Sequence, residues 1–186
     1  MRLLALIGCL LLAAACGPLD ATQSGGREAR PVELLTVLPS PGSLRGPPAA
    51  AADAAALAQG FTGVENEELV RRIRDRAPVS AAVRSWRGPR GGVLVATVSV
   101  WHSHIVATGV GSDIAAELVA DGGVAWTPPD VPGSRGARRE DPARRELRLA
   151  YAVGPNSLYV RAQGPVPDET VQKTLRRLIQ GLEGEG

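Results

Sequence analysis

Two stretches of the chain each combine two apolar segments, a Gly-Pro turn and an amphipathic helix, and this pattern constrains the fold most strongly. The first stretch places residues 81–87 and 93–101 on either side of Gly-Pro-Arg-Gly-Gly, which is typical of a β-hairpin. The second places residues 145–153 and 157–163 on either side of Gly-Pro-Asn. We therefore predict two antiparallel hairpins, each followed by a helix, and this order suggests a ββα duplication.

A helix is predicted after each hairpin. Residues 103–120 carry an apolar side chain at every fourth position from Val106 onward, which indicates one buried helical face. Ser103 is placed to cap the first turn of this helix. Residues 167–182 form the second helix, with a continuous apolar stripe along one side.

Two further helices are predicted before the first hairpin. Residues 49–59 are rich in alanine, and Gly60 follows them at a position that commonly ends a helix. Residues 67–76 follow Asn66, a favoured capping residue. The predicted fold class is α+β, an antiparallel sheet of four or more strands with helices packed on it. Four helical segments would cover one face of this sheet and leave the other partly open.

The α+β domain is predicted to span residues 49–186, and residues 16–48 are predicted to lead into it. Residues 17–30 are small and polar, as flexible tethers are. Residues 31–48 form a proline-rich lead-in, within which residues 32–38 are apolar enough to lie on the domain as an edge strand.

The first fifteen residues have the layout of a secretory signal. Arg2 is followed by an uncharged apolar run, and three alanines then precede Cys16. With cysteine at the first mature position, this segment resembles the signal peptide of a bacterial lipoprotein. The resemblance implies removal of residues 1–15, a diacylglyceryl group on the Cys16 sulfur, and acylation of the new N-terminus by a fatty acid such as palmitate. It also implies an extracytoplasmic protein that is anchored to the cell membrane by lipid.

Three other interpretations of the N-terminus stay open. The stretch Leu6–Cys9 fits the lipoprotein pattern better letter by letter, but it leaves too short an apolar core. The three alanines also satisfy the rule of ordinary signal peptidase, which would release a soluble protein with a free Cys16. An uncleaved anchor is disfavoured, because a spanning helix needs about 20 apolar residues.

Charge, cysteine content and composition narrow the class of protein. The net charge of +2 is too balanced for a nucleic-acid partner. After signal removal one of the two cysteines is left, so no intramolecular disulfide is expected. The basic residues are almost all arginine, and Ala, Gly and Pro are abundant, as in GC-rich genomes. With its signal segment, the chain resembles the many small actinobacterial lipoproteins of unknown function, and the specific part of that resemblance is residues 1–16.

The candidate catalytic residues are two histidines and two carboxylates. His102 and His104 are two apart, so on a continued strand they would share a face, where two imidazoles are able to bind one metal. Asp113 and Glu117 lie one helical turn apart on the following helix. A zinc site takes three or four ligands, and the mature chain has no third histidine and no spare cysteine, so we predict neither a metal nor a cofactor. The plainer interpretation is a polar strand end beside a helix cap.

Function is predicted mainly from what is missing. The chain has no G-x-S-x-G elbow, no H-E-x-x-H motif and no P-loop. We therefore expect a non-enzymatic binding or accessory module whose partner is an envelope protein, lipid or glycan. The alternative is an envelope hydrolase that uses the histidine and carboxylate candidates. An arginine-rich run over residues 135–148 suits an anionic lipid, a wall polymer or an acidic partner, unless it is simply a solvated loop. The binding candidates are Trp126, Arg138, Arg139, Arg144 and Arg145.

Overall fold

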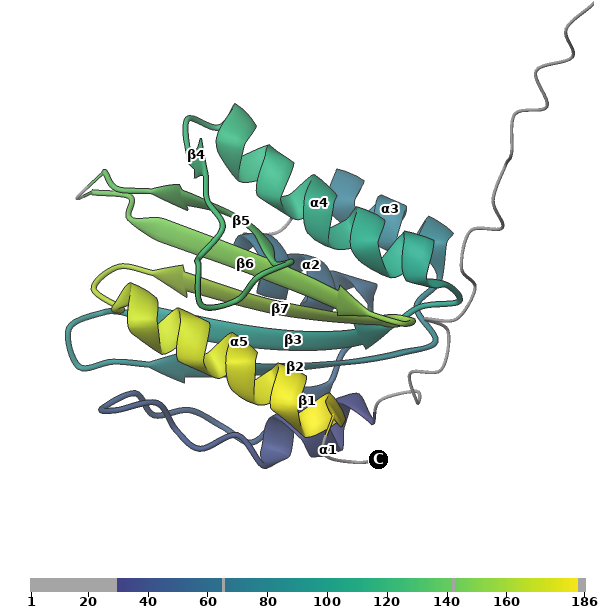
Figure 1. Ribbon diagram of the computed structural model, residues 1–186, viewed down its shortest axis with the longest axis horizontal. Coiled ribbons are helices and arrows are strands. Elements are labelled where there is room, and N and C mark those ends of the chain that lie inside the picture. The colour runs from purple at the N-terminus through teal and green to yellow at the C-terminus, as the bar shows by residue number, and fades with distance from the viewer. Residues whose placement is uncertain (1–29, 65, 142, 184–186) are drawn as a thin grey trace, which may run out of the picture.

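The computed structural model describes residues 30–64, 66–141 and 143–183, so the predicted signal segment and Cys16 lie outside the described residues. Its centre is a seven-stranded antiparallel sheet with the order β1-β2-β3-β7-β6-β5-β4 (Figure 1). The antiparallel α+β class is therefore confirmed. The strands are β1 (Ala50–Ala51), β2 (Ser80–Arg87), β3 (Val93–Val100), β4 (Val124–Ala125), β5 (Arg135–Arg139), β6 (Glu146–Val153) and β7 (Asn156–Gln163).

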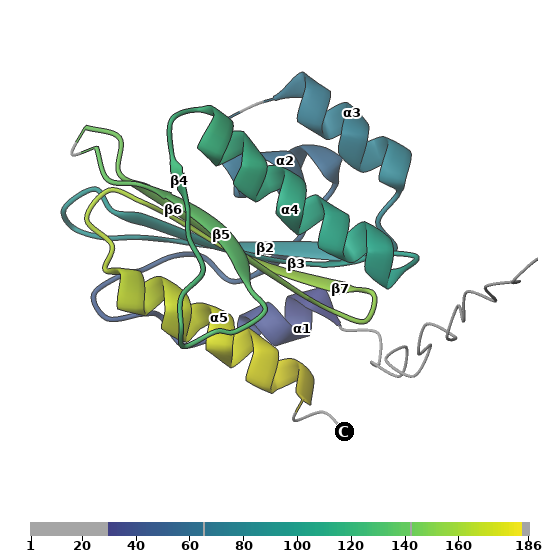
Figure 2. The same ribbon diagram turned by 45° about the horizontal axis from the view of Figure 1, so that its top comes forward.

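Helices cover both faces of the sheet, which differs from the expected partly open face. On one face, α2 (Ala54–Thr62) and α4 (His104–Ala120) lie against the strands, with α3 (Glu67–Arg76) beside them (Figure 2). We call this the α4 face. On the other, the α5 face, α1 (Pro31–Thr36) packs beside α5 (Asp168–Glu183). No helix in the described part of the chain is long and apolar enough to span a membrane.

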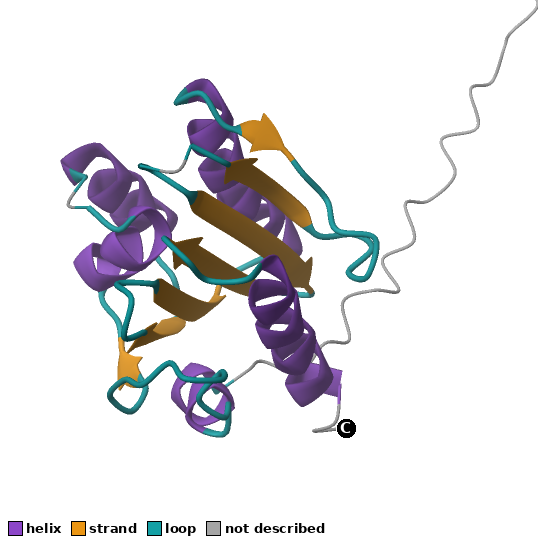
Figure 3. Ribbon diagram, turned by 90° about the vertical axis from the view of Figure 1, so that its left-hand side faces the viewer, coloured by secondary structure: helices purple, strands orange, loops and turns teal. Residues whose placement is uncertain are grey.

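The two predicted hairpins are present, and β3 pairs with β7 to join them. The order strand-strand-helix therefore occurs twice along the chain. A two-fold axis between two antiparallel strands would leave both following helices on the same face of the sheet. Here α4 and α5 lie on opposite faces (Figures 2 and 3). The repeated order of elements is thus not a repeated arrangement in space.

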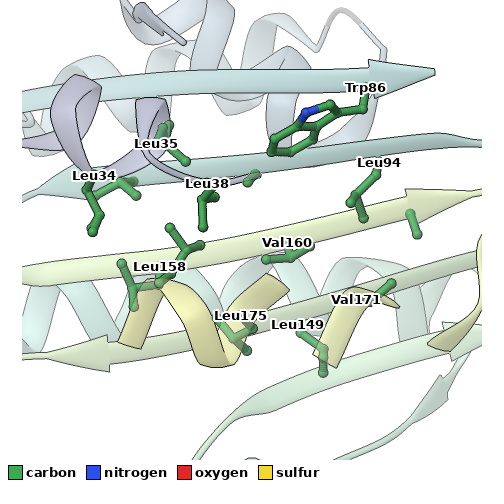
Figure 4. Packing of buried hydrophobic residues seen from close by; sticks show 14 of the residues in the cluster. Leu34, Leu35, Leu38, Trp86, Leu94, Leu149, Leu158, Val160, Val171 and Leu175 are labelled. Carbon is green, nitrogen blue, oxygen red and sulfur yellow. The ribbon is translucent and has the colours of Figure 1, made fainter. Parts of the chain in front are cut away.

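The proline-rich lead-in is part of the folded domain, and its apolar segment is a helix instead of an edge strand. Pro31 occupies the first turn of α1, where its missing N–H costs nothing. Leu34 and Leu35 then point into the core of the α5 face (Figure 4). The Arg84 guanidinium secures the end of the helix, since its Nη1 donates to the Leu35 carbonyl at 2.8 Å and to the Leu38 carbonyl at 2.7 Å. The folded unit therefore begins before the expected boundary at residue 49.

The core of the α5 face is built from alternate strand residues and apolar helix residues. Because side chains alternate between faces along a strand, Leu94, Leu158 and Val160 all point toward α1 and α5 (Figure 4). Trp86, from β2, is fully buried among them. The α4 face has its own apolar cluster, which includes Phe61, Trp101 and Ile114.

Helix α2 is displaced from its predicted position. Residues 50–51 pair with β2, and the helix starts after Asp53, whose carboxylate accepts the N–H of Ala56 at 2.8 Å. It runs through Gly60, because that glycine lets the helix approach the sheet. A Cβ there would lie 2.8 Å from Thr97 Cγ2. Gly63, with φ of 79°, ends the helix instead.

The predicted caps of the next two helices are confirmed. Asn66 Oδ1 accepts the N–H of Leu69 at 3.0 Å, and α3 has the predicted bounds. Ser103 Oγ accepts the N–H of Val106 at 3.3 Å at the start of α4. These local signals need no tertiary partner, and this is why the sequence places them correctly.

Substituting Gly63 by alanine should destabilise the fold much more than the same change at Gly91. Both glycines have φ near 80°, so both variants carry the backbone penalty of about 1 kcal/mol. At Gly91 the added Cβ meets nothing within 4 Å, whereas at Gly63 it overlaps the guanidinium of Arg161. That guanidinium has little room to move, because Arg161 is buried and its Nε donates to the Gly60 carbonyl. We expect a loss of about 3 kcal/mol for Gly63→Ala and about 1 kcal/mol for Gly91→Ala, measured as free energies of unfolding in urea. Equal losses would contradict the close packing at Gly63.

Candidate functional site

The two histidines do not share a strand face. β3 ends at Val100, so His102 lies in the connecting turn and His104 is the first residue of α4. Both histidines are exposed, and His104 Nδ1 lies 3.1 Å from the carbonyl oxygen of Gly154. In the described residues, no group of three or more His, Cys, Asp or Glu side chains is placed to hold a metal ion.

The two carboxylate candidates connect α4 to α3. Asp113 Oδ2 accepts a hydrogen bond from Arg76 at 2.7 Å, and Glu117 forms an ion pair with Arg72. The hydrogen bond with Glu117 raises the pKa of the Arg72 guanidinium above its ordinary value. Neither carboxylate lines the cavity that His104 borders. The four catalytic candidates therefore do not converge, and their arrangement gives no support to the hydrolase alternative.

A cavity of about 200 Å³ lies between the first half of α4 and the edge of the sheet. Small residues line it where α4 approaches β6 closely, since a Cβ on Gly111 would lie 2.7 Å from Ala150 Cβ. We call this space the α4 cavity. Its apolar floor is Ala107, Gly111, Ala150 and Ala152, and its other lining residues are His104, Thr108, Ser112, Gly133, Arg135, Tyr151 and Ser157.

Arg135 is the charged residue at the rim of the α4 cavity. Its Nη1 donates to Ser112 Oγ at 2.7 Å, and the Ser112 hydroxyl donates to the Thr108 carbonyl at 2.9 Å. Across the described ranges, Arg135 has no carboxylate within ion-pair distance. The Nε2 atom of His104 lies 3.4 Å from the Thr108 hydroxyl on the same side of α4. The cavity therefore offers an unneutralised cation, an imidazole and hydroxyl groups above an apolar floor.

Trp126 lies near this cavity but is half-buried. A second hollow of about 340 Å³, on the other side of the Arg135–Ser112 contact, includes Trp126 in its lining. The indole packs against the core of the α5 face. The Arg138 guanidinium lies 5.7 Å from the centre of its ring, a cation–π arrangement. The residue is thus not the freely exposed loop tryptophan that sugar binding favours.

The predicted arginine cluster is largely engaged within the protein. Arg139 binds the Asp121 carboxylate at 2.6 Å, and Arg145 binds the Asp168 carboxylate at 2.6 Å. The hydrogen bond from Arg139 is the main cause that lowers the pKa of Asp121. Arg144 is exposed and has no side-chain partner in the part of the chain that the structure describes. Arg139, Arg144 and Arg145 line one hollow of about 380 Å³ together with Glu146. Arg138 pairs with Glu140 at 3.3 Å.

A layer of buried polar side chains, which was not predicted from the sequence, lies beneath α4 and α2. Arg148 Nε donates to Glu146 Oε1 at 2.7 Å, and both side chains are more than nine-tenths buried. Arg161 Nε donates to the Gly60 carbonyl at 3.2 Å, at the negative end of the α2 dipole. Burial lowers the pKa of the Arg161 guanidinium. The signal was present, since these residues alternate with apolar neighbours along β6 and β7 and therefore share one face.

Ionisation of the Tyr159 phenol should lower the free energy of unfolding at high pH. Its hydroxyl donates to the Phe61 carbonyl at 2.7 Å, and burial raises the pKa of the phenol well above its ordinary value. The pKa of the phenol is about 10 in the unfolded chain and higher in the folded protein. The protonated Tyr159 therefore contributes its whole stabilisation below pH 10, and this contribution is lost as the pH rises above 10. We expect a loss of about 1.4 kcal/mol per pH unit above pH 10 in urea unfolding. Tyr159→Phe should lack this loss, and an identical pH profile in both proteins would contradict the assignment.

Comparisons with known proteins identify a fold. No family model matches the chain, and no curated protein does. Among solved structures, the extracellular domain of PknH from Mycobacterium tuberculosis matches with a TM-score of 0.58. The match covers 86% of this chain and 100% of that chain at 9% sequence identity. At this identity the likeness shows a shared fold.

Proposed function

We propose that the protein is an extracytoplasmic accessory or sensor module, which binds a ligand or partner and catalyses no reaction. The observation that carries this proposal is the fold shared with the extracellular domain of PknH. The source of that neighbour also agrees with the actinobacterial composition of the chain. The candidate carboxylates are engaged with α3, which favours a binding role over hydrolysis.

We further propose that the module is held at the outer face of the cell membrane by lipid on Cys16. The support is the arrangement of the apolar run, the three alanines and the cysteine. The chain between Cys16 and Arg30 spans at most about 50 Å when fully extended. The domain would therefore stay close to the membrane, where an envelope protein, a lipid or a glycan is the expected partner. Within the predicted cluster, Arg144 supports an anionic partner best, because it is exposed and has no side-chain partner in the described residues.

In-cell crosslinking of the tagged full-length protein, followed by mass spectrometry, tests this function. We expect one specific envelope component to be recovered with the wild type and lost with the Cys16→Ala variant. Recovery from both forms alike would contradict membrane-dependent binding. Turnover of an envelope substrate that disappears in a His104→Ala variant would overturn the non-enzymatic proposal.

A further inference from the structure

The sheet has an open edge where β6 extends beyond β5. The pairing of these strands ends at Arg135 and Ala150, whereas β6 continues to Val153. The chain before β5 turns toward the α5 face of the sheet, since Val131 packs in the core of that face. Nothing in the described strands pairs with the last three residues of β6 on this side.

The backbone of Ala152 points to this open edge. Along an antiparallel strand, successive residues direct their N–H and C=O groups to opposite neighbours. The Trp126 N–H bonds the Gly136 carbonyl at 2.9 Å, so Gly136 faces away from β6 and Arg135 faces toward it. Arg135 is opposite Ala150, and the groups of Ala152, two residues further on, therefore point to the same side.

The open edge and the charged rim belong to one space. Ala152 and Arg135 both line the α4 cavity, and His104 lies on its opposite wall. At this edge the Ala152 N–H is a hydrogen-bond donor and the Ala152 C=O is an acceptor. Both groups face the position that β5 would occupy if it continued. Beside them lies a guanidinium that has only the Ser112 hydroxyl as its side-chain partner in the described ranges. An amide group would complement the backbone groups of Ala152, and a carboxylate at the adjacent position would complement the guanidinium of Arg135.

We infer that the α4 cavity binds the C-terminal end of an extended peptide, which is the specific form of the binding role proposed above. The peptide adds to the open edge by backbone hydrogen bonds to Ala152, as in β-strand addition. Its terminal carboxylate pairs with Arg135 in place of the Ser112 hydroxyl, and its chain enters past His104. The alanine floor favours an apolar side chain such as that of alanine at the last residue of the peptide.

Calorimetric titration of the full-length protein with acetyl-Ala-Ala tests the inference. The matched ligand is acetyl-Ala-Ala-amide, which keeps the backbone groups and loses the charge. Sodium acetate is the matched anion, which keeps the charge and loses the backbone. We expect the free acid to bind at least 10-fold tighter than either, because a hydrogen bond to a charged group is stronger than one between neutral groups. Equal binding of acid and amide, or of dipeptide and acetate, would overturn the inference.

Variants of the protein test the Arg135 guanidinium and the backbone edge at Ala152 separately. Arg135→Gln should weaken the binding of acetyl-Ala-Ala at least 10-fold. The control variant Arg90→Gln makes the same charge change in the exposed β2–β3 turn and should change this affinity by less than twofold. Ala152→Pro removes the edge N–H without removing a ladder bond, and it should weaken binding of both dipeptides. Ala107→Leu, which fills the floor, is the second variant if Ala152→Pro lowers the melting temperature. Undiminished binding in Arg135→Gln would refute the inference.

The crosslinking experiment distinguishes this inference from the general function. If Arg135→Gln still captures the same envelope component while the dipeptide fails to bind, the peptide site is wrong and the accessory role stands. If the dipeptide binds as expected and no membrane-dependent partner is captured, the peptide site stands and the tethered role fails.

Discussion

Replacing Cys16 by alanine is expected to move nearly all of the protein from the membrane pellet to the soluble fraction. The predicted anchor is lipid alone, and no helix in the described residues is able to span a membrane. Each buried methylene of an acyl chain contributes about 0.8 kcal/mol, so two or more chains give stable attachment that the variant loses. Ultracentrifugation of cell lysates and labelling with an alkyne analogue of palmitate measure the two effects.

Cys9 supplies the matched control for this prediction. A Cys9→Ala variant keeps an apolar run before Cys16, so it should retain both the label and the membrane association. Loss of label in Cys9→Ala alone would show that Cys9 is the modified residue. A labelled or membrane-bound Cys16→Ala protein would contradict the lipid anchor at Cys16, and a soluble wild type would indicate ordinary signal cleavage.

Replacing Arg148 by alanine should cost about 3–5 kcal/mol of folding free energy. The side chains of Arg148 and Glu146 are 8% and 9% exposed, so the variant leaves the Glu146 carboxylate buried without its partner. It also removes the hydrogen bond from Arg148 Nη1 to the Ile114 carbonyl at 3.3 Å, beneath α4. Urea unfolding followed by circular dichroism measures the loss.

Two further variants show whether the loss comes from the unpaired charge. The double variant Glu146→Leu, Arg148→Met removes both charges at similar volume and should recover most of the stability. The exposed pair of Glu68 and Arg71 is the surface comparison, and Arg71→Ala should cost less than about 1 kcal/mol. If the double variant is as unstable as Arg148→Ala, then packing, and not the buried charge, dominates at this position.

The helices and hairpins that the sequence placed correctly depend on neighbouring residues. Asn66 and Ser103 cap the helices that follow them, and the Gly-Pro turns join the predicted strands. The misplaced elements depend on distant residues. α1 is a helix that Arg84 of β2 secures, and α2 continues through Gly60 because that residue contacts Thr97 of β3. Local propensity has no information about such contacts.

Some residues of the candidate site were singled out from the sequence, but their arrangement in space was not predicted. The sequence singled out His104 as one of two histidines and Trp126 as a loop tryptophan, and both border hollows beside Arg135. It also grouped His104 with Asp113 and Glu117, although both carboxylates face α3. Arg135 was noted only as the first residue of the arginine-rich run, and Ala152 carried no signal, because the cavity exists only where β5 stops short of β6.

The sequence by itself determined the fold class, the two hairpins and the caps of α3 and α4, because turn chemistry, alternation and capping act within a few residues. It also predicts a lipoprotein-like signal that ends at Cys16, which lies outside the described residues. Only the tertiary structure decided that β3 pairs with β7 and that α4 and α5 lie on opposite faces. It alone decided that Arg148 pairs with Glu146 beneath α4 and where the sheet edge stays open. These outcomes depend on the packing of side chains far apart in the chain, so no local pattern encodes them.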